Sequence, residues 1–193
     1  TIILLLIINL VSIYIFNYNH NSRKSDRYSK LPDVVKANYS HLSKSEVNSI
    51  LNATWGGGWE YEEVLGFKER SRSSKYVNVN SFGFRNKTDL ENFLVELNGA
   101  IWFFGGSSTF GYGVADQETI PSILESYLDT KVVNLGRGYY FSEQENLLLM
   151  KLLKVGVRPS KVVFLDGINE RCSIQNYQNE MKSIFFKAQK PHN

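Results

Sequence analysis

The chain has 193 residues, of which 42% are hydrophobic and 21% are charged, and its 22 basic and 19 acidic residues give a formal charge of +3. These proportions are typical of a globular protein with room for one α/β domain, and they exclude a largely disordered chain. The single cysteine, Cys172, excludes an internal disulfide framework. Because the three histidines also lack the spacing of a zinc site, we expect no metal and no cofactor. No basic helix with interleaved aromatic residues is present, so we expect no nucleic-acid partner.

The first predicted element is hydrophobic, because Thr1–Phe16 is almost wholly apolar. At ~1.5 Å per residue this stretch falls slightly short of a bilayer core of ~30 Å. Since residue 1 is not methionine, we expect a start further upstream, which would complete a transmembrane or signal-anchor segment over residues 1–18. A signal peptide that is later removed is the alternative, although no small-residue cleavage pattern follows Phe16. The sequence therefore predicts a single-pass membrane protein.

Residues 19–98 are polar and irregular, and we interpret them as a stalk that leads to a cap. A short helical pattern occurs near Ser43–Leu51, and a glycine run follows at Gly56–Gly58. The alternation in Lys75–Asn80 predicts a strand, and Ser81–Arg85 has the composition of a turn that ends it.

From residue 99 to 193 the pattern changes to short apolar runs that alternate with helical segments. Such alternation is typical of βαβ units and a parallel sheet. We expect strands near 100–105, 131–135 and 161–166, and helices over Asp116–Tyr127 and in the leucine-rich segment after Ser142. Because βαβ crossovers are right-handed, these elements predict the first half of a doubly wound sheet.

The loops after the three predicted strands hold the small and reactive residues. These loops are Gly105–Thr109, Asn134–Gly138 and Asp166–Glu170. In an open parallel sheet, ligands bind beyond the carboxyl ends of the strands. We therefore expect the three loops to form one site.

In this stretch, roughly Ile101–Glu170, the chain resembles the SGNH, or GDSL-type, superfamily of esterases and lipases. Gly105–Thr109 matches the first block of that superfamily, Gly-Asp-Ser-x-Thr, with glycine in place of aspartate. Gly167–Glu170 matches the block Gly-x-Asn-Asp with glutamate in place of the last aspartate. The resemblance implies a three-layer α/β/α, flavodoxin-like fold, of which the chain holds only the first half. On this basis we expect the chain to be a fragment, truncated at both ends.

The resemblance also implies roles for individual residues. Ser107 is the expected nucleophile, and the side-chain amide of Asn169 is the expected oxyanion donor. The glycine block is looser, because Tyr139 stands where the superfamily has its oxyanion glycine. A backbone N–H of Gly138 or Tyr139 would serve there, and we favour Gly138. We interpret Arg137 as a surface cation or as one that braces this loop, rather than as a substrate clamp.

The fourth block of the superfamily, Asp-x-x-His, does not occur in this sequence, so no catalytic histidine is assigned. The resemblance implies a membrane-anchored serine ester hydrolase that acts on small-molecule, carbohydrate or lipid esters without a cofactor. An O-acyltransferase that acts on cell-envelope carbohydrate is the second reading, and a non-catalytic binding module is the third. We expect the catalytic domain outside the cytoplasm. By the positive-inside rule, the basic stretch Arg23–Lys30 would instead keep the domain in the cytoplasm. The sequence therefore leaves the side of the membrane undecided.

Overall fold

The computed structural model describes residues 26–86, 88, 90–165 and 169. The chain divides into two compact units, one up to Asn52 and one from Ala53 onward, whereas the sequence analysis placed a boundary between residues 98 and 99. The predicted membrane segment, residues 1–18, lies outside the described residues. Among the residues that are described, no helix has both the length and the apolar character needed to cross a bilayer.

The first unit is helical. It contains the 3₁₀ helices η1 (Tyr28–Lys30) and η2 (Ala37–Tyr39), the short helix α2 (Asp33–Lys36) and most of α3 (Lys44–Trp55). The start of α3 is fixed by a capping box: the N–H of Ser43 donates to the Glu46 carboxylate (3.0 Å), and the N–H of Glu46 donates to the Ser43 hydroxyl (3.3 Å). The helix predicted near Ser43–Leu51 is confirmed.

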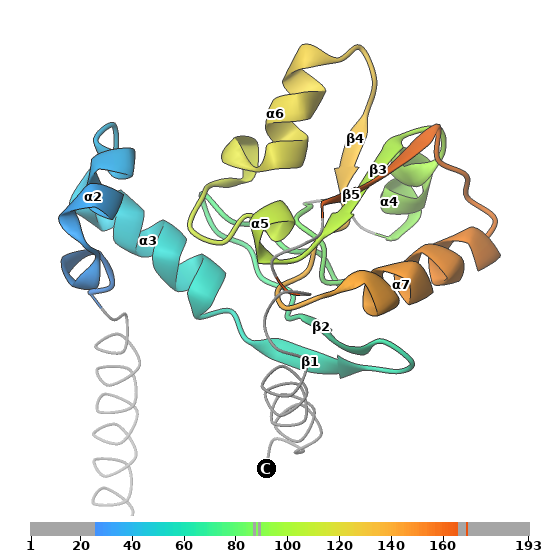
Figure 1. The fold of residues 1–193 in the computed structure, drawn as a ribbon, viewed down its shortest axis with the longest axis horizontal. Coiled ribbons are helices and arrows are strands. Elements are labelled where there is room, and N and C mark those ends of the chain that lie inside the picture. The colour runs from blue at the N-terminus through green and yellow to red at the C-terminus, as the bar shows by residue number, and fades with distance from the viewer. Residues whose placement is uncertain (1–25, 87, 89, 166–168, 170–193) are drawn as a thin grey trace, which may run out of the picture. The chain divides into compact units, whose positions relative to one another are not determined.

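The second unit is built on a parallel sheet of three strands, β3 (Ile101–Gly105), β4 (Val132–Asn134) and β5 (Lys161–Leu165) (Figure 1). The strands lie in the order β4-β3-β5, and all three were predicted from the apolar runs. The prediction of an α/β fold with a parallel sheet is therefore confirmed.

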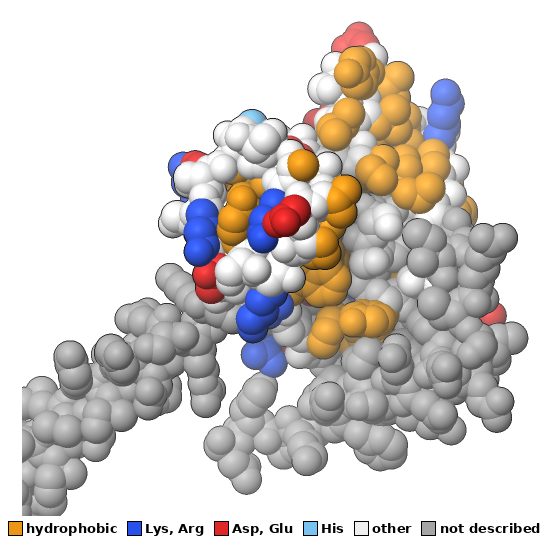
Figure 2. Space-filling model, turned by 60° about the vertical axis from the view of Figure 1, so that its left-hand side comes forward, with side chains coloured by type: hydrophobic (Ala, Val, Ile, Leu, Met, Phe, Trp, Pro, Cys, Tyr) orange, Lys and Arg blue, Asp and Glu red, His pale blue; other side chains and the backbone are white. Residues whose placement is uncertain are grey.

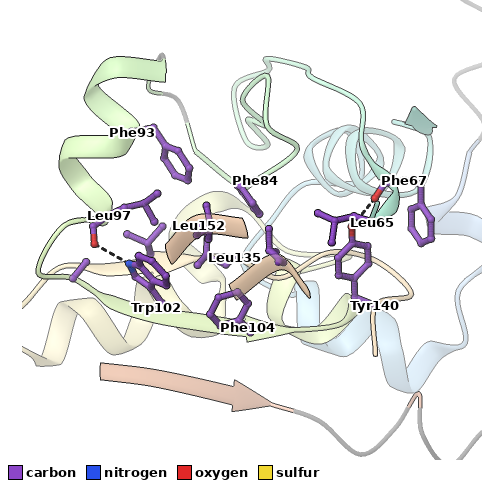
Figure 3. Packing of buried hydrophobic residues seen from close by; sticks show 13 residues of the cluster. Leu65, Phe67, Phe84, Phe93, Leu97, Trp102, Phe104, Leu135, Tyr140 and Leu152 are labelled. Carbon is purple, nitrogen blue, oxygen red and sulfur yellow. Dashed lines mark hydrogen bonds between the residues drawn. The ribbon is translucent and has the colours of Figure 1, made fainter. Parts of the chain in front are cut away.

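Helices cover both faces of this sheet. On one face, Trp102 and Phe104 of β3 pack with residues of α4 (Leu90–Leu97) and α7 (Ser142–Lys154) in the main apolar core (Figure 3). The indole N–H of Trp102 donates to the carbonyl of Leu97 (2.8 Å), which fixes the end of α4 to the sheet. On the other face, Ile101 and Phe103 pack with Leu124 of α6 (Ile120–Tyr127).

The connections explain why the helices lie on opposite faces. The chain passes from β3 through α6 to β4 on one side, and then returns through α7 to β5 on the other side of β3. Two right-handed crossovers that run in opposite directions place their helices on opposite faces. The strand order therefore reverses at β3, and the crevice beyond the ends of β3 and β5 is where such sheets bind ligands.

The segment before the sheet contains an antiparallel hairpin that the sequence analysis did not predict. It is formed by β1 (Trp59–Glu62) and β2 (Gly66–Glu69). The strand predicted over Lys75–Asn80 is wrong, because that stretch makes only the isolated bridge between Arg72 and Val79. The backbone N–H of Asn78 donates instead to the Asp116 carboxylate (3.1 Å). This side chain thus accepts an N–H that, in a strand, would donate to the carbonyl of a neighbouring strand.

This cap segment, residues 59–85, shares its core with the sheet. Leu65, Phe67 and Phe84 belong to the same buried cluster as Trp102 and Phe104, as Figure 3 shows. The connection from the sheet to α6 runs through the short helices α5 (Ser107–Phe110) and η3 (Asp116–Glu118).

Apolar side chains on the outer side of α6 remain exposed. Ile120, Ile123 and Tyr127 follow a helical spacing, and Tyr127 is 82% exposed. Figure 2 shows apolar side chains gathered near the top of the view, the height at which α6 lies in Figure 1. The helix therefore covers the sheet with Leu124 and leaves a second apolar stripe in solvent.

Candidate functional site

Ser107 lies where the central strand of the sheet gives way to a helix. It is the first residue of α5, separated from the end of β3 by Gly106, and it is half-buried, whereas Ser108 is exposed. The carbonyl of Gly106 accepts from the N–H of Phe110 (3.0 Å), and the carbonyl of Ser107 accepts from the N–H of Gly111 (3.0 Å). These bonds form one tight helical turn that fixes the backbone of Ser107 at the carboxyl end of the sheet.

Asn134, the last residue of β4, joins the neighbouring loop to this turn. Its buried side-chain amide donates to the carbonyl of Thr109 (2.8 Å), and its side-chain oxygen accepts from the N–H of Gly136 (3.0 Å). The N–H of Arg137 donates to the carbonyl of Gly105 (3.0 Å). The loop after β4 is therefore held directly against the loop that carries Ser107.

Asn169, beyond the end of β5, completes the meeting of the three loops. Its Nδ2 donates to the carbonyl of Tyr140 at 2.5 Å. A Cβ atom added to Gly106 would collide with Nδ2 of Asn169 and would lie 3.2 Å from the Tyr140 carbonyl oxygen. Two predicted site residues, Ser107 and Asn169, are thus brought to the same edge, with Asn169 packed against the residue that precedes Ser107. An asparagine amide has two N–H groups, so donation to Tyr140 uses one and leaves the second.

Gly138 lies in the same loop, but its amide is engaged elsewhere. The N–H of Gly138 donates to the carboxylate of Glu69. A Cβ at Gly138 would lie 2.6 Å from the Tyr112 hydroxyl and 2.9 Å from Oε1 of Glu69, so only glycine fits. The part that Gly138 plays as an oxyanion donor stays a prediction.

Tyr139 has a backbone conformation that favours glycine. Its φ is +65°, in the left-handed region. Its ring packs edge to face against Trp59, with 5.5 Å between the ring centroids. The position at which the SGNH superfamily has glycine thus adopts a glycine-like backbone here, although a tyrosine occupies it. The Tyr139 amide therefore remains the alternative to Gly138.

Glu69 is the centre of a buried polar cluster beside this loop. It is 1% exposed, accepts the Tyr112 hydroxyl at 2.5 Å and pairs with Arg72 at 3.3 Å. Burial raises the pKa of the Glu69 carboxyl above its ordinary value, against the opposing effects of Tyr112 and Arg72. Burial and the Glu69 carboxylate also raise the pKa of the Tyr112 hydroxyl, which keeps its proton and donates it. Sequence reasoning missed Glu69 and Tyr112, because neither belongs to a recognisable motif.

The raised pKa of Glu69 predicts a pH-dependent stability. A carboxyl whose pKa is higher in the folded than in the unfolded protein stabilises the fold below the unfolded value, and this contribution is lost as the pH rises through the folded value. The variant Glu69→Gln keeps an acceptor for Tyr112 and Gly138 but does not titrate. From about pH 4.5 to neutrality, wild type should lose free energy of unfolding relative to Glu69→Gln, as measured by urea denaturation.

A matched control is Glu63→Gln, at an exposed glutamate in the turn between β1 and β2. Its free energy of unfolding should follow that of wild type at every pH in the series. Curves for wild type and Glu69→Gln that stay parallel would contradict the raised pKa.

Arg137 braces the loop from inside the protein. Its guanidinium is fully buried, pairs with Glu62 of β1 and donates to the Tyr140 hydroxyl (2.6 Å) and the Phe82 carbonyl (2.6 Å). It also stacks on Phe84, 4.6 Å from the ring centroid. Burial acts to lower the pKa of Arg137, but Tyr140 and Glu62 outweigh that effect and raise it. Arg137 is therefore not a surface cation, because its side chain is buried, and these contacts agree with the loop-bracing alternative.

A general base for Ser107 is not found among the described residues. Within them, the Ser107 hydroxyl makes no hydrogen bond, and the only histidine is His41, in the first unit. His20 and His192 lie outside the described residues, as do Asp166, Gly167 and Glu170 of the third motif. The site therefore holds a hydroxyl and amide donors, with no assigned proton acceptor.

Neither profiles of known protein families nor characterised protein sequences give a match to this chain.

Proposed function

We propose that this protein is a membrane-anchored serine ester hydrolase of the SGNH type, with Ser107 as the nucleophile. The supporting observation is that Asn169 lies against Gly106, the residue before Ser107, at the point where the strand order of the sheet reverses. A side-chain amide from one strand end thus lies against the backbone that leads into Ser107 at another, where an α/β sheet binds its ligands. The three-layer SGNH fold and the extracytoplasmic location are parts of the same proposal.

The chemistry is acyl transfer in two steps. Oγ of Ser107 bonds to the ester carbonyl carbon, and the tetrahedral intermediate then releases the alcohol, which leaves with a proton. Water attacks the resulting acyl-serine and frees the acid. In both steps negative charge develops on the carbonyl oxygen, and N–H donors that are fixed before the reaction stabilise it. The amide of Asn169, the backbone N–H of Ser107 and a backbone N–H from Gly138 or Tyr139 would be those donors.

The expected test is ester hydrolysis by wild type and by Asn169→Ala, with p-nitrophenyl acetate as the probe. Loss of one oxyanion donor should lower kcat by about a hundredfold or more, equivalent to roughly 3 kcal/mol, with a smaller effect on KM. Asn92→Ala, at an exposed asparagine of α4, is the matched control and should retain wild-type turnover.

The results also separate the alternatives. Turnover that rises strongly when a carbohydrate acceptor is added would favour O-acyl transfer, since the acyl-serine then passes to a sugar hydroxyl instead of water. Absence of turnover in wild type, with and without an acceptor, would favour the non-catalytic module. Equal kcat in wild type and Asn169→Ala would remove Asn169 from the site.

A further inference from the structure

A polar cavity of about 530 Å³ lies in the cap segment. We call it the serine cavity, and it is lined chiefly by Ser71, Arg72, Ser73, Ser74, Asn78 and Asn80. Its volume is within the range of small-molecule sites, and Val79 is the only apolar residue among its described lining residues. Apart from Arg72, which pairs with Glu69, none of its lining residues belongs to the site around Ser107.

Three serine hydroxyls of this cavity donate their protons in hydrogen bonds within the protein. Ser71 donates to the carbonyl of Val79 (3.1 Å), Ser73 donates to Oδ1 of Asn78 (2.8 Å) and Ser74 donates to the carbonyl of Val77 (2.8 Å). A hydroxyl has one proton and two lone pairs. All three serines are exposed, so they offer acceptor oxygens to a ligand.

Two of the residues that line the cavity also carry donors. Asn80 is 93% buried, and its Oδ1 accepts from the N–H groups of Phe82 (3.0 Å) and Phe84 (3.1 Å). Its Nδ2 has no partner within the described part of the chain, and neither has Nε of Arg72. Buried polar atoms without a partner are uncommon in folded proteins, so these two N–H groups are candidate donors to a ligand.

Charge in the wall of the cavity is balanced. Among the lining residues that the structure describes, Arg72 is the ionisable one, and its guanidinium pairs with Glu69. Asn78 donates to Asp116 (2.7 Å), and that carboxylate in turn pairs with Arg85. An anion needs donors and an excess of positive charge, whereas this wall offers mostly acceptors and little net charge.

We propose that the serine cavity binds a neutral polyhydroxylated ligand, the sugar unit of a glycan. Each sugar hydroxyl donates one hydrogen bond and accepts others, which fits serine oxygens set beside the N–H groups of Asn80 and Arg72. The site is a binding site in its own right and does not depend on reaction at Ser107.

The test is saturation-transfer-difference NMR on the whole chain, with maltotriose and chitotriose as probes. We expect signals from at least one sugar with wild type, and a Kd at least about tenfold higher with Asn80→Asp, which keeps Oδ1 as an acceptor and removes the Nδ2 donor. The matched control Asn92→Asp, on α4, adds the same charge outside the cavity and should bind as wild type does.

A second variant guards against misfolding of Asn80→Asp. The double substitution Ser71→Ala and Ser73→Ala removes two acceptors from exposed positions and should also weaken binding. Three results would overturn the proposal: no signal from either sugar, equal affinity in wild type and both cavity variants, or displacement of the sugar by equimolar inorganic phosphate. Because sugar binding is measured without ester turnover, it succeeds or fails separately from the proposed hydrolase function.

Discussion

Ser107→Ala is expected to abolish covalent labelling by a fluorophosphonate probe and to lower ester turnover by at least about a thousandfold. The reason is chemical, because alanine has no oxygen with which to form the acyl intermediate. The backbone turn of α5 should persist, since its hydrogen bonds run between main-chain atoms. Mass spectrometry of the labelled peptide and kcat for p-nitrophenyl acetate provide the two readouts.

Ser108 supplies a matched control for this prediction. It is the next residue of the same helical turn, it is exposed, and Ser108→Ala removes an identical group. We expect Ser108→Ala to be labelled at Ser107 and to turn over at the wild-type rate. Labelling that persists in Ser107→Ala and disappears in Ser108→Ala would show that the nucleophile was assigned to the wrong serine.

The largest effect on stability is expected at Arg137. Arg137→Met should lower the free energy of unfolding by about 3–5 kcal/mol, because it leaves the Glu62 carboxylate without its buried cation and the Phe82 carbonyl without its donor. Lys151 also contacts Glu62 (2.6 Å), but it is half-exposed and cannot replace the buried guanidinium of Arg137. Urea denaturation with an unchanged m value is the appropriate measurement.

Two further substitutions identify the cause. Arg137→Lys retains the charge and loses the planar fork, so its stability should lie between those of wild type and Arg137→Met. Arg158→Met, at an exposed arginine, should cost no more than about 1 kcal/mol. A loss at Arg137 as small as that at Arg158 would contradict the role of Arg137 as a structural brace.

The elements of the sheet could be predicted from the sequence because their signal is local. The run Ile101–Phe104 ends at two glycines, and the run Val162–Leu165 lies between Lys161 and Asp166. Short apolar runs of this kind indicate buried strands, and β3 is packed on both faces. The strand predicted over Lys75–Asn80 failed for a non-local reason. The Asp116 carboxylate, far along the chain, takes the N–H and side chain of Asn78, and no alternation of residues reveals that partner.

The candidate site was predictable to the same extent. Topology alone brings the ends of β3 and β5 together, so Ser107 and Asn169 could be expected near each other. The bond from Gly138 to Glu69 could not be expected, because it depends on the β1–β2 hairpin packing against the loop after β4. Glu69 looks like an ordinary polar position of a strand, and only its burial distinguishes it.

The close approach of Gly106 and Asn169 makes the two positions evolutionarily interdependent. The space that a side chain at 106 would need is filled by the Asn169 amide, so a larger residue at 106 is tolerated only if residue 169 shrinks or moves. The same constraint runs in reverse, since a shorter residue at 169 would open room at 106. Substitutions at these positions should be non-additive, as expected for residues in direct contact. The residue at position 106 is thus constrained by its neighbour across the sheet edge, and a side chain at 106 requires a change at 169.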